Sequence, residues 1–282
     1  MTYLINQFNQ GHLKICFGVF LMILSLASAK EQLHFFVAVD SIYDAQQYLV
    51  QADKESLIFI DVDSTLTLPS DPYLRRLAII KHKNIYDQLT GPLTANQIRI
   101  FKHLHVMDSP SLLIEEAWPT VIKSLQERGI KTLALTAAKT GPIKSVLSSF
   151  PEWRYGELRR LGIDFSRACL GTALFEELED FGGDHPGIEK GIIYCGHQVS
   201  KGDLLPYVLK VMKFTPSLII FIDDKMENLE SLSAAIQQSF PDIRFIGIHY
   251  TGMDRLENPV TEEDIFRQKF QALVEKTKEI AS

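Results

Sequence analysis

Aspartates directly follow two apolar segments of the chain, where a buried strand would end. Asp61 and Asp63 come after the first segment, and Asp223 and Asp224 come after the second. One carboxylate can attack phosphorus as a nucleophile, and another can protonate the leaving oxygen and then deprotonate water. Further carboxylates supply the oxygen ligands that Mg²⁺ prefers, and the cation offsets the repulsion between a phosphate and an anionic nucleophile. These residue types therefore suit phosphoryl transfer at Asp61.

Two further polar residues occupy comparable positions. Thr136 follows an apolar segment and could donate a hydrogen bond to a phosphate oxygen, and Lys201 could supply a positive charge. Taken singly, these residues have simpler roles as a strand-end hydroxyl and a surface lysine. Asp61 and Asp63 could likewise cap a helix or form a turn. The acids after the second segment fit such roles less well, because buried acids need partners or a metal.

The elements that must position these residues alternate along the chain. Nearly continuous apolar segments predict strands buried on both faces of a parallel sheet, at 57–60, 132–135, 218–222 and 245–248. Amphipathic stretches predict helices between them, at 114–128, 143–150, 201–212 and 227–240. This alternation predicts an α/β fold with a doubly wound parallel sheet. The polar residues then lie at the sheet edge where open α/β folds bind ligands.

Four short motifs surround these residues in a fixed order. They are 58–65 (IFIDVDST), 135–138 (LTAA), 200–205 (SKGDLL) and 219–228 (IIFIDDKMEN). In this order they resemble the motifs of the haloacid dehalogenase-like (HAD) superfamily, whose members are mostly phosphatases. Each motif alone is a weak signal, whereas all of them in order are a strong one. The resemblance covers roughly 57–250 and is greatest for a group of exported bacterial HAD-like proteins of poorly defined function.

The resemblance implies a role for each aspartate. Asp61 is the nucleophile that forms an aspartyl-phosphate, and it also binds the metal. Asp63 is the general acid and base, with its backbone carbonyl on the metal. Asp223 and Asp224 bind Mg²⁺ directly or through water, and we favour Asp224 as the direct ligand. An acid at Asp63 implies a phosphatase rather than a dehalogenase, because dehalogenation has no leaving alcohol to protonate.

The resemblance assigns the phosphate to Thr136 and Lys201. After the threonine many relatives carry an arginine, whereas this chain has two alanines and then Lys139. A lysine provides a point charge but not the planar fork of a guanidinium, so the substrate preference stays open at this position.

The resemblance also implies a division into domains. The HAD-like core comprises 30–65 and 117–282, with a smaller insertion at 153–199 and a helical cap at 66–116 that closes over a small substrate. Three cap residues follow the nucleophile closely, and we favour a solvated helix face over substrate contact for them. These residues are Tyr73, Arg75 and Arg76.

The pattern at 1–29 is typical of a secretory signal peptide. Its uncharged apolar segment, 15–26, is too short to span a bilayer, and a small-x-small cleavage pattern follows at 27–29. A buried helix or a retained anchor is the alternative. No later apolar stretch reaches spanning length, so we expect an exported protein, periplasmic or secreted, without a stable membrane span after cleavage. Cys169 and Cys195 then form either a disulfide or two separate thiols.

Composition and charge exclude several classes of protein. With 46% hydrophobic and 23% charged residues, the chain is globular rather than disordered. A net charge of -6 without a basic run argues against a nucleic-acid partner. We expect a Mg²⁺-dependent phosphate monoester hydrolase that acts on a small phosphorylated substrate or on a phosphoprotein. The alternatives are a non-catalytic binding protein on an HAD core and a phosphotransferase.

Overall fold

Strands and helices alternate along most of the chain. The structure is a computed structural model that describes residues 33–143, 146–168, 171–180, 182–256 and 260–282. The chain divides into two units, Met1–Phe35 and Phe36–Ser282. The predicted signal peptide at 1–29 lies outside the described residues, and the fold below is that of the second unit. None of the described helices is both long and apolar enough to cross a bilayer.

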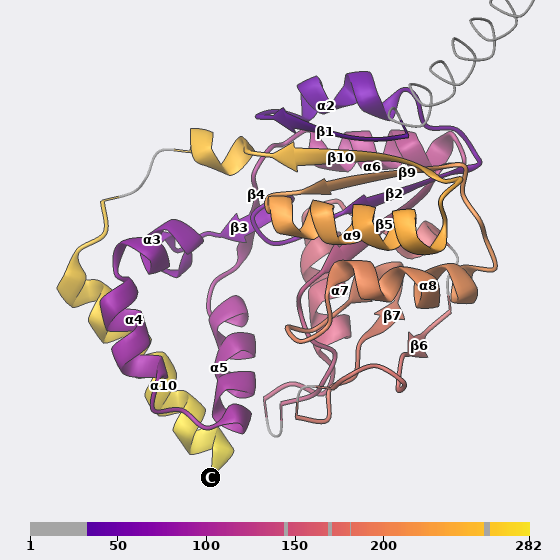
Figure 1. Ribbon diagram of the computed structural model, residues 1–282. Helices are drawn as coiled ribbons and strands as arrows, with labels where there is room; N and C mark the ends of the chain where they lie inside the picture. The colour runs from indigo at the N-terminus through magenta and orange to yellow at the C-terminus, as the bar shows by residue number, and fades with distance from the viewer. Residues whose placement is uncertain (1–32, 144–145, 169–170, 181, 257–259) are drawn as a thin grey trace, which may run out of the picture. The chain divides into compact units, whose positions relative to one another are not determined.

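A mostly parallel sheet forms the centre of this unit, with the strand order β1-β10-β9-β2-β5-β8-β7-β6 (Figure 1). Its strands are β1 (His34–Val39), β2 (Ser56–Ile60), β5 (Lys131–Thr136), β6 (Ala173–Leu174), β7 (Gly187–Glu189), β8 (Ile192–Tyr194), β9 (Leu218–Asp223) and β10 (Arg244–Tyr250). Adjacent strands from β10 to β8 run parallel, and β7 and β6 add an antiparallel edge. The α/β class is confirmed, and the predicted strands correspond to β2, β5, β9 and β10.

The strand register brings three carboxyl ends to one edge of the sheet. Ile60 at the end of β2 pairs with Ile222 on β9 and with Ala134 on β5. The amide of Asp61 extends this ladder by donating to the Ile222 carbonyl at 2.9 Å. Every residue of β2 and β9 is buried, which explains why these strands appear as continuous apolar runs in the sequence.

Helices cover both faces of the sheet. Alternate side chains of β2, including Leu57 and Phe59, join the hydrophobic cluster beneath α8 and α9, whereas α6 packs against β5 from the other face (Figure 1). The elements concerned are α2 (Ile42–Leu49), α6 (Trp118–Glu127), α8 (Lys201–Met212), α9 (Met226–Ser239) and the short 3-10 helices η2 (Ser166–Ala168) and η3 (Gly252–Arg255).

The segment 66–116 forms helices between two short strands. Its elements are β3 (Thr67–Pro69), η1 (Pro72–Leu74), α3 (Arg76–Lys81), α4 (Lys83–Thr90), α5 (Ala95–Met107) and β4 (Ser111–Leu113). The helices agree with the helical character predicted for this segment. The antiparallel pair β3–β4, which closes the segment at its base, does not follow from the sequence analysis because each strand has only three residues.

The C-terminal helix α10 (Glu263–Ala281) packs on the helices of this insertion. Phe266 and Phe270 of α10 stack at 4.3 Å and share a hydrophobic cluster with Phe101 of α5 and Ile85 of α4. The predicted core includes 117–282, because an amphipathic helix does not indicate which surface its apolar face meets.

One predicted helix, 143–150, is wrong. In the described part of this segment, Ile143 and Leu147 form an isolated β-bridge, and helix α7 (Phe150–Arg160) begins where the prediction ends. The Ser149 side chain accepts a hydrogen bond from the amide of Glu152, and Pro151 lies in the first turn of α7. Both are signals of a helix start, and they set this boundary more strongly than the apolar spacing before them.

The close approach of α8 and α9 gives a test of the fold. A Cβ atom added at Gly202 would lie 2.3 Å from the backbone oxygen of Ser231 on α9. We expect Gly202→Ala to lower the free energy of unfolding by about 1–3 kcal/mol in urea denaturation. Gly156→Ala in α7 is the matched control, because its Cβ would meet nothing within 4 Å. That change should raise the stability by up to about 1 kcal/mol, and equal effects of the two substitutions would contradict this packing.

Candidate functional site

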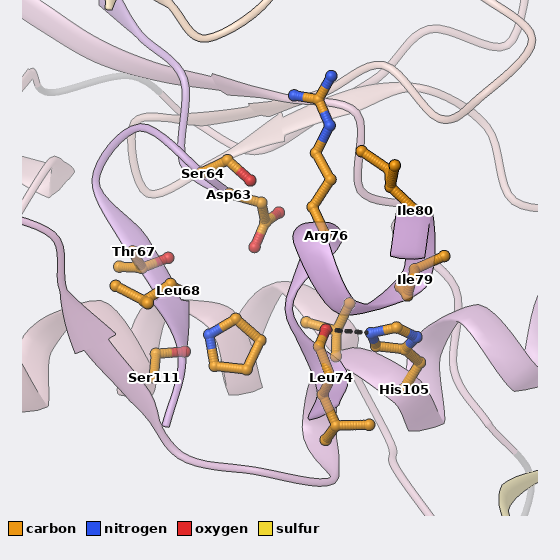
Figure 2. A pocket seen from close by; sticks show the side chains of 12 residues that line it. Asp63, Ser64, Thr67, Leu68, Leu74, Arg76, Ile79, Ile80, His105 and Ser111 are labelled. Carbon is orange, nitrogen blue, oxygen red and sulfur yellow. Dashed lines mark hydrogen bonds between the residues drawn. The ribbon is translucent and has the colours of Figure 1, made fainter. Parts of the chain in front are cut away.

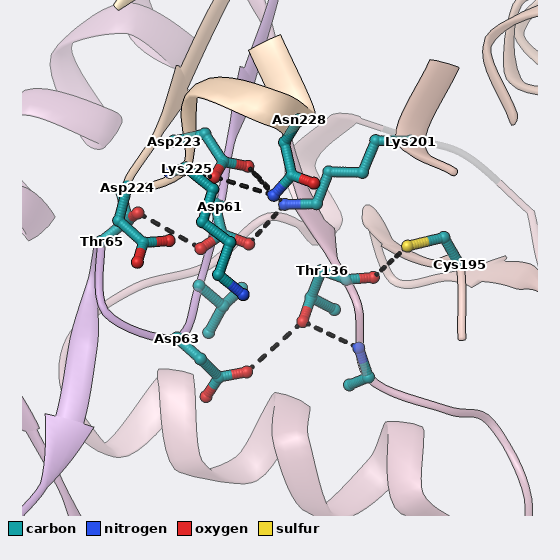
Figure 3. A network of polar contacts seen from close by, with 12 residues as sticks. Asp61, Asp63, Thr65, Thr136, Cys195, Lys201, Asp223, Asp224, Lys225 and Asn228 are labelled. Carbon is teal, nitrogen blue, oxygen red and sulfur yellow. Dashed lines mark hydrogen bonds and ion pairs between the residues drawn. The ribbon is translucent and has the colours of Figure 1, made fainter. Parts of the chain in front are cut away.

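A buried lysine lies between two buried aspartates at the carboxyl edge of the sheet (Figure 3). Lys201 Nζ donates to Asp61 Oδ1 and to Asp223 Oδ2, at 2.6 Å in each case. The Lys201 and Asp223 side chains are 2% and 0% exposed, and that of Asp61 is 7% exposed. Burial disfavours the ammonium, but the two carboxylates raise the pKa of Lys201, so the lysine is charged at neutral pH.

The turn after β2 and the start of α8 hold this arrangement in place. Beyond Asp61 the chain turns sharply, with the amides of Leu66 and Thr67 both donating to the Val62 carbonyl at 2.9 Å. Thr65 Oγ1 donates to Asp61 Oδ2 at 3.2 Å, which ties the turn to the nucleophile candidate. The Ser200 side chain caps α8, so that Lys201 is the first helical residue and faces the strand ends.

Asp223 uses all of its hydrogen-bonding capacity within the protein. Its carboxylate accepts from Lys201, twice from the Asn228 amide at 2.9 and 3.0 Å, and from the Lys225 backbone amide at 2.8 Å. An ionised carboxylate offers about four lone pairs, so none is left for a further ligand. The neighbouring Asp224 carboxylate has Arg76 of α3 as its ion-pair partner.

Three carboxylates converge to form a candidate cation site. One oxygen each from Asp61, Asp223 and Asp224 lies within 4.8 Å of the others, and we call these three residues the carboxylate cluster. Burial raises the pKa of Asp61 above its ordinary value, the Lys201 ammonium opposes this rise, and the two neighbouring carboxylates add to it. Burial and Asp223 also raise the pKa of Asp224.

One cation near the cluster can leave it. Lys201, Arg76 and Lys225 all lie near the three carboxylates, and the Arg76 side chain is 45% exposed, so it can turn toward solvent. Oxygen ligands of this kind suit hard cations such as Mg²⁺ and Ca²⁺. The residues therefore fit a divalent cation in place of the Arg76 guanidinium.

The chain matches one protein family and is similar to bacterial proteins. The family model matches residues 38–279, which include the carboxylate cluster. The chain belongs to the family described as "Protein of unknown function (DUF2608)". The uncharacterized protein RP296 of Rickettsia prowazekii (strain Madrid E) is 25% identical over 224 residues, which cover 78% of this chain and 77% of that protein. An uncharacterized protein of Rickettsia felis (strain ATCC VR-1525 / URRWXCal2) is 26% identical over 62% of each chain.

Asp63 of this DUF2608 protein faces away from the carboxylate cluster (Figure 3). Arg154 Nη2 lies 3.1 Å from Asp63 Oδ1 and 3.2 Å from Oδ2, and Thr136 Oγ1 donates to Oδ2 at 3.4 Å. The Asp63 side chain is 48% exposed, whereas that of Arg154 is 1% exposed. The structure thus brings Asp63 and Thr136 together on the open side of the cluster and Lys201 on its buried side.

Two residues at the DUF2608 site are not among the site residues predicted from the sequence. Arg154 lies in α7, outside every motif, and nothing in its local sequence indicates that it meets Asp63. Asn228 lies within the fourth motif and at the start of the helix predicted at 227–240; it occupies the first turn of α9 and also binds Asp223. An amide five residues after a buried acid is the signal that could have indicated this contact.

Other predicted residues have structural partners in this DUF2608 chain. Arg75 donates to the backbone carbonyls of Pro69 and Ser70. Lys139 is buried, and burial together with the nearby cations of Lys102 and Arg99 lowers its pKa to about 7. The nearby Asp184 carboxylate opposes this lowering of the Lys139 pKa.

The structure describes one of the two cysteines for which a disulfide or separate thiols are predicted. Cys195 is a free, buried thiol, and its Sγ donates to the Thr136 carbonyl at 3.1 Å. Cys169 lies outside the described residues.

The buried position of Lys201 predicts a large effect on stability. Lys201→Met leaves Asp61 and Asp223 buried without their shared cation, and breaking a buried pair in this way costs about 3–5 kcal/mol. We expect a loss of this size in the free energy of unfolding, measured in urea at pH 7. Lys83→Met is the matched control, because Lys83 is 69% exposed in its pair with Asp87. The control should change the stability by no more than about 0.5 kcal/mol, and a similarly small effect at Lys201 would refute its structural role.

Proposed function

We propose that this protein is a Mg²⁺-dependent phosphate monoester hydrolase of the HAD type. The observation that carries the proposal is the carboxylate cluster with Lys201 at the carboxyl edge of the sheet. Asp61 of this cluster is followed two residues later by the half-exposed Asp63. The ordered motifs support the same function, since each contributes a residue to this edge. We propose a small phosphorylated substrate, because the site combines anionic and cationic groups and is open on one side.

Asp61 acts as the nucleophile in this proposal. One of its carboxylate oxygens attacks phosphorus, and the bond between phosphorus and the leaving oxygen breaks. Asp63 gives its proton to the leaving oxygen, which departs as an alcohol. Water then attacks the phosphorus of the aspartyl-phosphate, Asp63 takes a proton from that water, and phosphate departs as Asp61 is restored.

The remaining residues position these two aspartates. Lys201 holds Asp61 from the buried side, and its charge lies close enough to act on an incoming phosphate. Arg154 and Thr136 fix the direction of the Asp63 carboxylate toward the open side. These contacts orient the acid and the nucleophile before substrate arrives, which reduces the entropic cost of the reaction.

Asp61 and Asp224 are the metal ligands in this proposal, with Asp223 orienting its surroundings. Asp223 already uses its lone pairs on Lys201, Asn228 and Lys225, whereas Arg76 can release Asp224 to solvent. A bound Mg²⁺ would neutralise the phosphate charge and align it for attack. We also propose that the protein acts after export, in the periplasm or as a secreted protein, because of the pattern at 1–29.

Hydrolysis of p-nitrophenyl phosphate tests the proposed reaction. We expect the purified protein to release p-nitrophenol with Mg²⁺ present and not after removal of the cation by a chelator. Asp61→Asn removes the nucleophile and should lower the rate by at least about a thousandfold. Asp63→Asn should lower it by about 10²–10⁴-fold. Full activity of Asp61→Asn would exclude the covalent route, and transfer of phosphate to an added alcohol would indicate a phosphotransferase.

Binding of the cation can be measured without turnover. A ligand that binds only the folded state at 100 times its Kd stabilises that state by about 2.7 kcal/mol, so Mg²⁺ should raise the Tm of the wild type. Asp224→Asn should abolish this rise while leaving the cation-free Tm nearly unchanged. Asp264→Asn, at an exposed position in α10, is the matched control and should respond as the wild type does. A normal Mg²⁺ response in Asp224→Asn would remove Asp224 from the ligand set.

A further inference from the structure

A cavity of about 220 Å³ opens beside Asp63, between the turn after β2 and the helices of the insertion (Figure 2). Its walls are formed mainly by apolar side chains. These are Leu68, Pro69, Leu74, Ile79, Ile80 and Val106. Ile80 is 58% exposed, so an apolar side chain also lies at the opening of the cavity.

Some polar groups of this cavity are occupied by the protein itself. His105 Nε2 donates to the Leu74 carbonyl at 2.9 Å, since a carbonyl can only accept (Figure 2). Burial lowers the pKa of His105, so its ring is neutral at pH 7. Thr67 Oγ1 donates to the Val62 carbonyl at 3.3 Å. A ligand entering the cavity therefore meets mainly apolar side chains, together with the hydroxyls of Ser64 and Ser111.

The charged lining residues are Asp63 and Arg76. Asp63 pairs with Arg154, and Arg76 pairs with Asp224 of the carboxylate cluster. Figure 2 shows the Asp63 carboxylate directed into the space between Leu68 and the helix that carries Ile79. The cavity therefore begins at the side chain that the proposed mechanism requires next to the leaving oxygen.

We propose that this cavity binds the leaving group, and that the substrates are phosphate monoesters of a compact apolar alcohol or phenol. This inference rests on the proposed hydrolase. An apolar cavity of 150 Å³ in another protein holds benzene, so about 220 Å³ accommodates a phenyl ring with a small substituent. Burial of such a ring is favourable. Most hydroxyls of a sugar would lose water without gaining partners at the apolar walls, which makes sugar and nucleotide phosphates poorer ligands.

Phosphonates test the ligand class without any turnover, because their carbon–phosphorus bond is not hydrolysed. With Mg²⁺ present, phenylphosphonate should bind at least about tenfold more tightly than methylphosphonate in isothermal titration calorimetry. Equal affinities would overturn the proposal even if the protein hydrolyses p-nitrophenyl phosphate. A clear preference for phenylphosphonate without hydrolysis of any ester would support the ligand class and count against the hydrolase.

Substitutions in the cavity wall test whether the phenyl group of the phosphonate binds in this cavity. Val106→Phe fills the cavity and should reduce the ratio of phenyl- to methylphosphonate affinity by about tenfold. Val50→Phe, directly after α2, is the matched control, because Val50 is 67% exposed, and it should keep the wild-type ratio. Ile80→Asn at the exposed opening provides a second variant that leaves the core intact, and it should also lower the ratio. An unchanged ratio in Ile80→Asn and in folded Val106→Phe would place the phenyl group elsewhere.

Turnover distinguishes the two proposals from each other. We expect kcat/KM for phenyl phosphate to exceed that for glucose 6-phosphate by at least about tenfold. Efficient hydrolysis of glucose 6-phosphate at an equal rate would leave the hydrolase in place and overturn the inference about its substrates.

Discussion

The ion pairs of one buried lysine hold the site together. Lys201 begins α8, Asp61 follows β2 and Asp223 ends β9, so this single ammonium joins three elements that are distant in sequence. A buried charge is tolerated only with partners at hydrogen-bonding distance. The strand register, the cap of α8 and the close packing of α8 on α9 must therefore all be correct for these contacts to form.

The aspartates of the site lie in two different environments, one buried and polar and the other half-exposed beside apolar side chains. Asp61 and Asp223 lie in a region without solvent, where each carboxylate is fixed by several donors. Asp63, two residues further along, is half-exposed and adjoins an apolar cavity. The turn that begins at Val62 creates this difference, because it directs the Asp61 carboxylate toward Lys201 and the Asp63 carboxylate toward Arg154.

The sequence predicts the central strands and the residues at their ends well, because a strand buried on both faces must be apolar throughout and any acid that ends it is conspicuous. It does not predict Arg154, which reaches Asp63 only through the packing of α7. Nor does it predict the partner of α10, since an apolar helix face fits many surfaces. The helix start at Phe150 was open to prediction, because Ser149 and Pro151 are ordinary signals of that boundary.

The position of α10 has a consequence for the order in which the molecule is completed. Synthesis proceeds from the amino terminus, so the strands and helices of the sheet all precede α10, whose last residue is Ala281. The apolar side chains of α4 and α5 are made early but meet Phe266 and Phe270 only after α10 has been made. The insertion beside the site therefore gains this packing partner later than the strands of the sheet gain theirs.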